Sequence, residues 1–165
     1  MGNQVTDQTM SHHYKAVIDW KLNGPDFVKG RYSREHTWTF DGGVTVAASS
    51  SPNVVPAPWS NAAHVDPEEA FVASIASCHM LVFLWLASRD GFTLASYLDE
   101  AVGVMTKNER GALWVSNVTL HPQLAWSGER IPTVEQIAAL HHRAHEECFI
   151  ANSVKTEVRV ASVPH

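Results

Sequence analysis

Residues 66–89, which read DPEEAFVASIASCHMLVFLWLASR, predict one long helix near the middle of the chain. The opening DPEE is a helix start, because Asp suits the N-cap, Pro suits the first helical position, and two carboxylates meet the positive end of the helix dipole. Residues 71–88 carry no Asp, Glu, Lys or Arg, and Gly91 follows as a stop signal. We therefore expect a helix that is buried on most sides.

This apolar run is close to the minimum length for crossing a bilayer. Polar residues interrupt it at Ser74, Ser77, Cys78, His79 and Ser88. No other segment resembles a second span or a positively charged flank. The segment is therefore predicted to be a core helix, and no membrane partner is expected.

The composition is that of a folded protein of ordinary size. The chain has 165 residues, 45% of them hydrophobic and 18% charged, and its formal net charge is -5. We expect a disordered leader over residues 1–12 and a single domain over 13–165. With no Lys/Arg run, nucleic acid and anionic membranes are unexpected partners. Because no secretory signal is visible at the start, a reducing, cytoplasmic location is predicted.

Elements on either side of the long helix predict an α+β fold of order βββ-α-ββ-α-β. A Pro-rich loop at 49–61 precedes the helix, and a Thr-x-x-Gln capping box at Thr133 opens a second helix that ends near 148–152. Alternating or β-rich stretches predict the strands. These lie at 13–20, 32–40, 44–47, 100–107, 113–126 and 155–160.

The chain has two cysteines, Cys78 in the long helix and Cys148 at the end of the second. A lone cysteine among apolar residues is most often a buried, inert side chain. Two distant thiols that meet through the fold would instead form a redox couple. A nearby arginine would then favour the thiolate, which is the nucleophilic form.

Two other interpretations remain open from the residues alone. His141, His145 and Cys148 have spacing that places them on one helix face, so they are candidate zinc ligands. No CxxC or HExxH motif accompanies them. The third interpretation is a non-catalytic stress protein whose cysteines are buried and inert.

Two motifs taken together resemble the OsmC/Ohr family of hydroperoxide reductases. The first joins Asp66-Pro67-Glu68-Glu69 to Ala76-Ser77-Cys78-His79, and the second runs from His142 to Ser153 through Cys148. The resemblance extends from Tyr14 to Val160, and the ASCHM form is closer to the OsmC-like branch. It implies two central helices packed with curved antiparallel sheets in an intertwined homodimer.

The same resemblance implies the roles of four residues. Cys78 corresponds to the peroxidatic cysteine, Cys148 to the resolving cysteine, and Glu68 to the acidic residue ten positions before the reactive cysteine. The family's arginine comes from the N-terminal β region, where Arg34 is the first candidate and Arg31 the second.

The implied activity is a thiol-dependent peroxidase that acts in antioxidant stress defence. Cys78 would reduce organic peroxides, with hydrogen peroxide as a further candidate, and would pass through a sulfenic acid and a Cys78–Cys148 disulfide. An external dithiol, typically a lipoylated protein, would reduce that disulfide. The resemblance implies no metal and no organic cofactor.

Overall fold

The computed structural model describes residues 11–161, and the chain divides into two compact units at the boundary between Asp66 and Pro67. The predicted leader at 1–12 falls almost wholly outside the described residues. We describe each unit by itself.

The N-terminal unit contains a three-stranded antiparallel sheet of order β1-β2-β3. The strands are β1 (Ala16–Asp19), β2 (His36–Phe40) and β3 (Thr45–Ala48). β2 and β3 form the predicted hairpin, in which Gly43 adopts a φ of 85° that L side chains rarely adopt. Long loops without strand structure make up most of the remainder of this unit.

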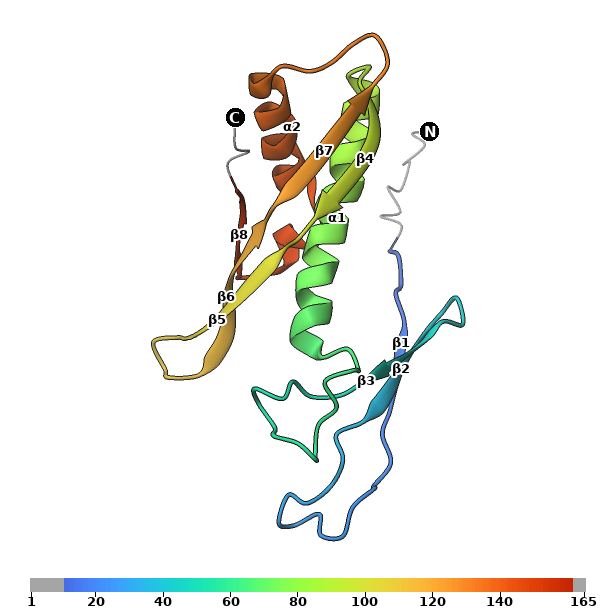
Figure 1. Cartoon of the computed structure of the whole chain (residues 1–165), viewed down its shortest axis with the longest axis vertical. Coiled ribbons are helices and arrows are strands. Elements are labelled where there is room, and N and C mark those ends of the chain that lie inside the picture. Colours follow the sequence, from blue (N-terminus) through green and yellow to red (C-terminus); the bar gives the residue numbers. More distant parts are fainter. Residues whose placement is uncertain (1–10, 162–165) are drawn as a thin grey trace, which may run out of the picture. The chain divides into compact units, whose positions relative to one another are not determined.

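The C-terminal unit contains both long helices and two sheets (Figure 1). β4 pairs with β7, and a second sheet has the order β5-β6-β8, in which β6 and β8 run parallel. The elements are α1 (Pro67–Arg89), β4 (Thr93–Asp99), β5 (Val102–Lys107), β6 (Leu113–Leu120), β7 (Pro122–Ser127), α2 (Val134–Glu147), the 3-10 turn η1 (Ala151–Ser153) and β8 (Glu157–Val160).

Both helices begin and end where local sequence signals place them. α1 starts directly after Asp66, and beyond its end the Phe92 amide donates to the Ala87 carbonyl while Gly91, at a φ of 78°, donates to Ser88. This is a Schellman cap, in which glycine takes the left-handed position. α2 begins with the predicted capping box between Thr133 and Gln136.

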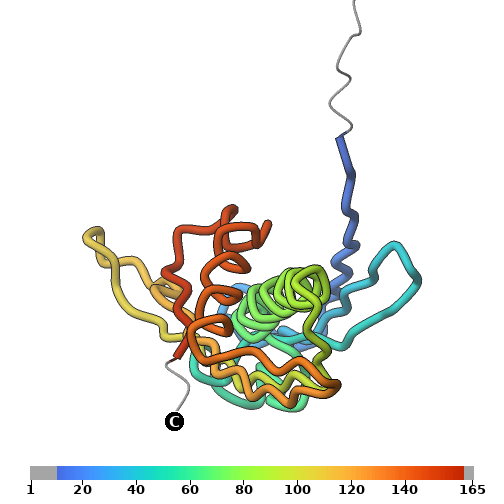
Figure 2. Tube along the Cα trace, turned by 90° about the horizontal axis from the view of Figure 1, so that it is seen from above, coloured from blue at the N-terminus to red at the C-terminus, as the bar shows by residue number. Residues whose placement is uncertain are grey.

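Two buried clusters hold the C-terminal unit together. The larger one packs α1 and α2 against β4 and β7, and its fully buried members include Phe83, Leu86 and Leu140. The smaller one places Ile75 of α1 against Val118 and Leu120 of β6. Figures 1 and 2 together show α1 and α2 side by side on one face of the β4–β7 pair.

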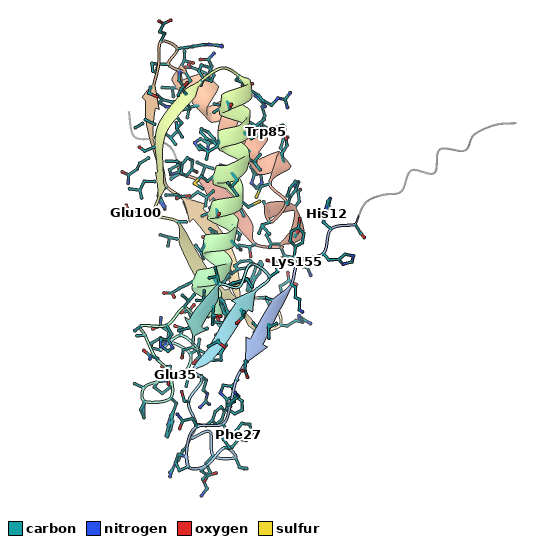
Figure 3. The ribbon with its side chains drawn as sticks, turned by 90° about the vertical axis from the view of Figure 1, so that its right-hand side faces the viewer. His12, Phe27, Glu35, Trp85, Glu100 and Lys155 are labelled. Carbon is teal, nitrogen blue, oxygen red and sulfur yellow. The ribbon has the colours of Figure 1, made fainter. Side chains whose placement is uncertain are left out.

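One face of α1 stays open. Ser77, Leu81 and Trp85 recur every four residues and are exposed, with Leu81 at 60% and Trp85 at 49% (Trp85 is labelled in Figure 3). By length and hydropathy α1 is the one helix among residues 11–161 that could cross a membrane, and 28% of its apolar window is buried. α1 packs on β4, β5, β6 and α2 as a core helix does, but it is buried on fewer sides than the sequence predicted, because no described element of the C-terminal unit covers the face with Leu81 and Trp85.

The structure confirms the α+β class but has four strands between the helices, where the sequence predicted two. The stretch 93–99 forms β4, and the predicted strand at 113–126 is two strands separated by His121. A register shift between Leu94 and Ser96 breaks the alternation that would have marked β4. At the second site the His121 amide donates to Asp99 Oδ1 at 2.7 Å, and the chain passes into the other sheet.

Candidate functional site

The fold brings Cys78 and Cys148 into direct contact where α2 ends against α1. Both cysteines are free thiols, and the two side chains lie within hydrogen-bond range of each other. Cys78 is partly exposed in the middle of α1, whereas Cys148 has no accessible surface. One thiol is therefore open to a reactant and the other is held behind it.

The turn after α2 supplies a backbone donor to each sulfur. The Ile150 amide lies 3.5 Å from Cys78 Sγ, and the Ala151 amide lies 3.4 Å from Cys148 Sγ. Asn152 fixes this turn, because its side-chain amide donates to the Glu146 carbonyl at 2.8 Å and to the Cys148 carbonyl at 3.1 Å. An N–H directed at a sulfur favours the thiolate over the thiol.

The two thiols differ in their electrostatic surroundings. Burial, with a contribution from the neighbouring Cys78, raises the pKa of the Cys148 thiol well above its ordinary value. Its position as the C-cap of α2 acts in the same direction, because a helix C-terminus disfavours negative charge. Cys148 is therefore a protonated thiol at neutral pH, and it can donate its S–H to Cys78.

Both candidate arginines belong to the N-terminal unit. Arg34 is half-buried there, its Nη1 donates to the carbonyls of Gly30 and Tyr32, and its guanidinium carbon lies 3.7 Å from the centre of the Tyr32 ring. Arg31 is exposed and pairs through its backbone with Asp26. Cys78 lies in the other unit, so its pairing with Arg34 stays a prediction.

Glu68 occupies the first turn of α1 and is partly buried. It precedes Cys78 by ten residues, which in an α-helix corresponds to about 15 Å along the axis. A direct bond between the two side chains is therefore not possible. A hydrogen-bonded link between Glu68 and the thiol requires a long side chain that bridges them, which is the role predicted for an arginine.

The predicted zinc ligands are not brought together. His141 is buried and pairs with His79, His145 is exposed, and Cys148 contacts Cys78. Within residues 11–161 no group of three His, Cys, Asp or Glu side chains is placed to hold a metal ion. The zinc interpretation was therefore wrong. Helical spacing predicted a shared face, but packing against α1 buries His141 and Cys148 in separate contacts and leaves His145 exposed.

Several features of the site have no clear signature in the sequence. The amides of Ile150 and Ala151 are backbone groups, and no residue type marks them. The role of Asn152 depends on the turn conformation that brings its side-chain amide to the Glu146 and Cys148 carbonyls. The pairing of His79 with His141 depends on how two distant helices pack.

An α+β unit with a partly exposed thiol in contact with a buried thiol defines this molecule as a dithiol protein. Residues 60–163 match the family described as OsmC-like protein, which is more than half of the chain. The chain belongs to the OsmC family, as its motifs predicted.

Solved structures agree with this assignment. An OsmC-like protein of unknown function from Vibrio cholerae O1 biovar eltor is 50% identical, with a TM-score of 0.89 over 92% of this chain and 99% of that one. An organic hydroperoxide resistance protein from Elizabethkingia anophelis is 17% identical (TM-score 0.66; 94% and 99% covered). The organic hydroperoxide resistance protein OhrB of Bacillus subtilis is 20% identical (0.61; 90% and 96%). The last two show a shared fold, and no curated protein matches the chain.

Proposed function

We propose that this protein is a thiol-dependent peroxidase that reduces organic peroxides, with hydrogen peroxide as a further candidate substrate. The contact between Cys78 and Cys148 carries the proposal, because one sulfur is accessible and the other is buried and protonated. Relatives of this fold described as organic hydroperoxide resistance proteins support the choice of substrate class.

The reaction balances with two thiols and one peroxide. The Cys78 thiolate attacks one peroxide oxygen, the O–O bond breaks, and the alkoxide takes up a proton and leaves as an alcohol. Cys78 becomes a sulfenic acid, which condenses with the Cys148 thiol to give a disulfide and water. An external dithiol then reduces the disulfide through a mixed disulfide and is itself oxidised. No step needs a metal or an organic cofactor.

Two further residues complete the proposed site. Arg34 would stabilise the Cys78 thiolate, with Arg31 as the second candidate, and Glu68 would hold the guanidinium between itself and the thiol. Glu68 and Cys78 are separated by about 15 Å along the helix axis, which leaves room for a side chain between them. The Ile150 amide supplies a second donor to the same sulfur.

The proposed partners follow from the surface of α1 and from the chemistry. Leu81 and Trp85 lie on an exposed, largely apolar helix face, at the end of which the Arg89 guanidinium carbon lies 4.6 Å from the centre of the Trp85 ring; this face suits a second copy of the chain in a homodimer. Substituting Leu81 with Glu should then shift the mass measured by light scattering from dimer to monomer. The dithiol reductant would be a lipoylated protein in the cytoplasm.

The central experiment follows peroxide consumption in the presence of a dithiol. Cys78→Ser should abolish turnover with cumene hydroperoxide, whereas Cys148→Ser should still consume one equivalent and accumulate a sulfenic acid at Cys78. Trapping with dimedone and mass spectrometry would identify it. Unreactive thiols and no change on peroxide addition would favour the inert stress protein instead.

Arg34→Ala and Arg34→Lys test the arginine, with Arg31→Ala as the matched control from the same unit. Arg34→Ala should slow the first oxidation of Cys78 strongly, and lysine should restore little because it lacks the planar fork of donors. Equal losses in the Arg31 and Arg34 variants would leave the assignment of Arg34 unsupported and require a different cation.

A further inference from the structure

A buried pair of histidines links the two helices that carry the cysteines. His79 Nε2 lies 3.0 Å from His141 Nδ1, and the two rings stack with centroids 5.3 Å apart and 11° between their planes. His79 is 1% exposed and His141 is 6% exposed. Figure 2 shows the two helices lying side by side, and this bond joins them through side chains.

The pair sits close to both cysteines in the sequence of each helix. His79 directly follows Cys78, and His141 precedes Cys148 by seven residues, which is nearly two full turns. His141 bonds to His79 and Cys148 contacts Cys78, so both residues of the α2 segment face α1. A shift of α2 against α1 would therefore move the histidine contact and the thiol contact together.

At neutral pH the contact is a bond between two uncharged rings. Burial lowers the pKa of each imidazole to about 4, and the neighbouring charges of His141 and His145 act in the same direction on His79. One ring donates an N–H and the other accepts it. The bond therefore needs a fixed distance and direction.

Stability alone does not account for a buried polar pair. Nε2 of His141 is buried and has no hydrogen-bond partner within residues 11–161, which is a cost that an apolar side chain would not carry. Phe83 stacks on the His141 ring at 4.3 Å, so the surroundings already suit an apolar residue. A directional bond, unlike apolar packing, selects one register between two helices.

We propose that the His79–His141 hydrogen bond is a positioning device, which holds the end of α2 in register so that the Cys148 sulfur faces Cys78 and the disulfide forms readily. This inference rests on the proposed Cys78–Cys148 disulfide and adds the residues that control it. His79 and His141 touch neither sulfur in this role. They act through the placement of α2.

A glutathione redox titration tests the proposal without peroxide. Glutathione disulfide oxidises the Cys78 and Cys148 thiols to a disulfide and is reduced to two glutathione molecules, and the equilibrium constant measures the effective concentration of one thiol at the other. His79→Leu and His141→Leu should each lower this effective concentration by roughly tenfold, the scale of one lost hydrogen bond. The double leucine variant should lose no more than either single variant, because the bond is already absent.

Matched variants distinguish a loss of helix register from a general weakening of the contact between α1 and α2. His141→Asn and His79→Gln place an amide near the original ring nitrogen and should remain within about threefold of the wild type. Arg143→Leu removes another link to α1, the 2.8 Å ion pair with Asp90 beyond the helix end, and should change the titration little. The thermal midpoint of each variant shows whether stability follows the same order.

Leucine variants that titrate like the wild type would overturn the proposal, as would an equal loss in Arg143→Leu. A wild type that forms no Cys78–Cys148 disulfide with glutathione disulfide would also overturn it. Failure of the peroxidase proposal is seen separately, as a protein that forms this disulfide with glutathione disulfide but consumes no peroxide.

Discussion

The two compact units differ in how much apolar surface they bury. In the C-terminal unit Phe83, Leu86 and Leu140 are buried in one cluster against β4 and β7. In the N-terminal unit the buried residues are small or polar, and several large hydrophobic side chains are exposed. These include Tyr14 at 88%, Leu22 at 59%, Phe27 at 52% and Val28 at 94%.

This difference indicates a division of roles. The C-terminal unit has its own core and fixes the two thiols on packed helices, which is the support that a precise site requires. The N-terminal unit is held by a small sheet and by surface aromatic contacts, such as the Phe27 and Tyr32 rings stacked at 4.5 Å. Substituting the same residue type in both units and comparing the loss of unfolding free energy tests this difference.

The largest effect is expected from truncating a phenylalanine. Phe83→Ala should lower the free energy of unfolding by roughly 3–5 kcal/mol, because Phe83 is fully buried and stacks on His141. Phe27→Ala, at a half-exposed ring, should cost about 1 kcal/mol or less. Urea denaturation measures both, and similar losses would mean that the N-terminal unit has a core comparable to the other.

Acid should weaken the C-terminal unit through its buried imidazoles. His79 and His141 have a pKa of about 4 when folded and 6.5 as a reference, so the unfolded chain takes up protons first as the pH falls. The stability that the two neutral imidazoles contribute is fully present above pH 6.5, is lost as the pH falls to about 4, and changes little below that. One such imidazole accounts for roughly 3 kcal/mol.

The control for this pH effect is His141→Asn. This variant lacks one of the two titrating rings, and it also lacks the positive charge that a protonated His141 would place next to His79. Because His145 on α2 and all carboxylates are retained, their contributions cancel between the two proteins. The variant should lose less stability than the wild type between pH 6.5 and 4 in urea titrations. An equal decline in both would contradict the buried, neutral pair.

Glycine substitutions sharpen the comparison at an intermediate scale. A Cβ added at Gly103 would lie 2.5 Å from Val72 Cγ2, so Gly103→Ala should cost about 1–3 kcal/mol through overpacking of β5 against α1. Gly42, in the N-terminal hairpin, has nothing within 4 Å, and Gly42→Ala should stay within about 0.5 kcal/mol of the wild type. Thermal unfolding of the two variants distinguishes them, and a tolerated Gly103→Ala would mean that α1 and β5 can move apart.

The smallest effect is expected from two threonines. Thr133→Ala removes the capping box that opens α2 and should cost about 1 kcal/mol. Thr39→Ala removes the hydroxyl contact with Thr45 at 3.0 Å across the N-terminal sheet, which is worth a few tenths of a kcal/mol, roughly. If the order in chemical denaturation were reversed, α2 would not depend on its cap.

The parts of the fold that the sequence predicted are those with local signals. DPEE and Gly91 bound α1, and Thr133 with Gln136 opens α2. β4 was missed because its register shift interrupts the alternation of inward and outward side chains. Local patterns therefore found both helices but miscounted the strands between them.

For the candidate site, the sequence identified the two cysteines through their resemblance to a family, and it located them on two helices. It could not supply the amides of Ile150 and Ala151, since these depend on a turn geometry and not on a residue type. It also could not pair His79 with His141, which are 62 positions apart and meet only through helix packing. The roles of Arg34 and Glu68 stay predictions.

The short turn after α2 has a consequence for how the two sulfurs behave over time. One peptide stretch both presents Cys148 and directs the Ile150 N–H at Cys78. Any displacement of this stretch would withdraw the Ile150 N–H and the Cys148 thiol from Cys78 in one movement. Under the proposed chemistry, a sulfenic acid formed on Cys78 in such a conformer would have no partner thiol and would be open to further oxidation.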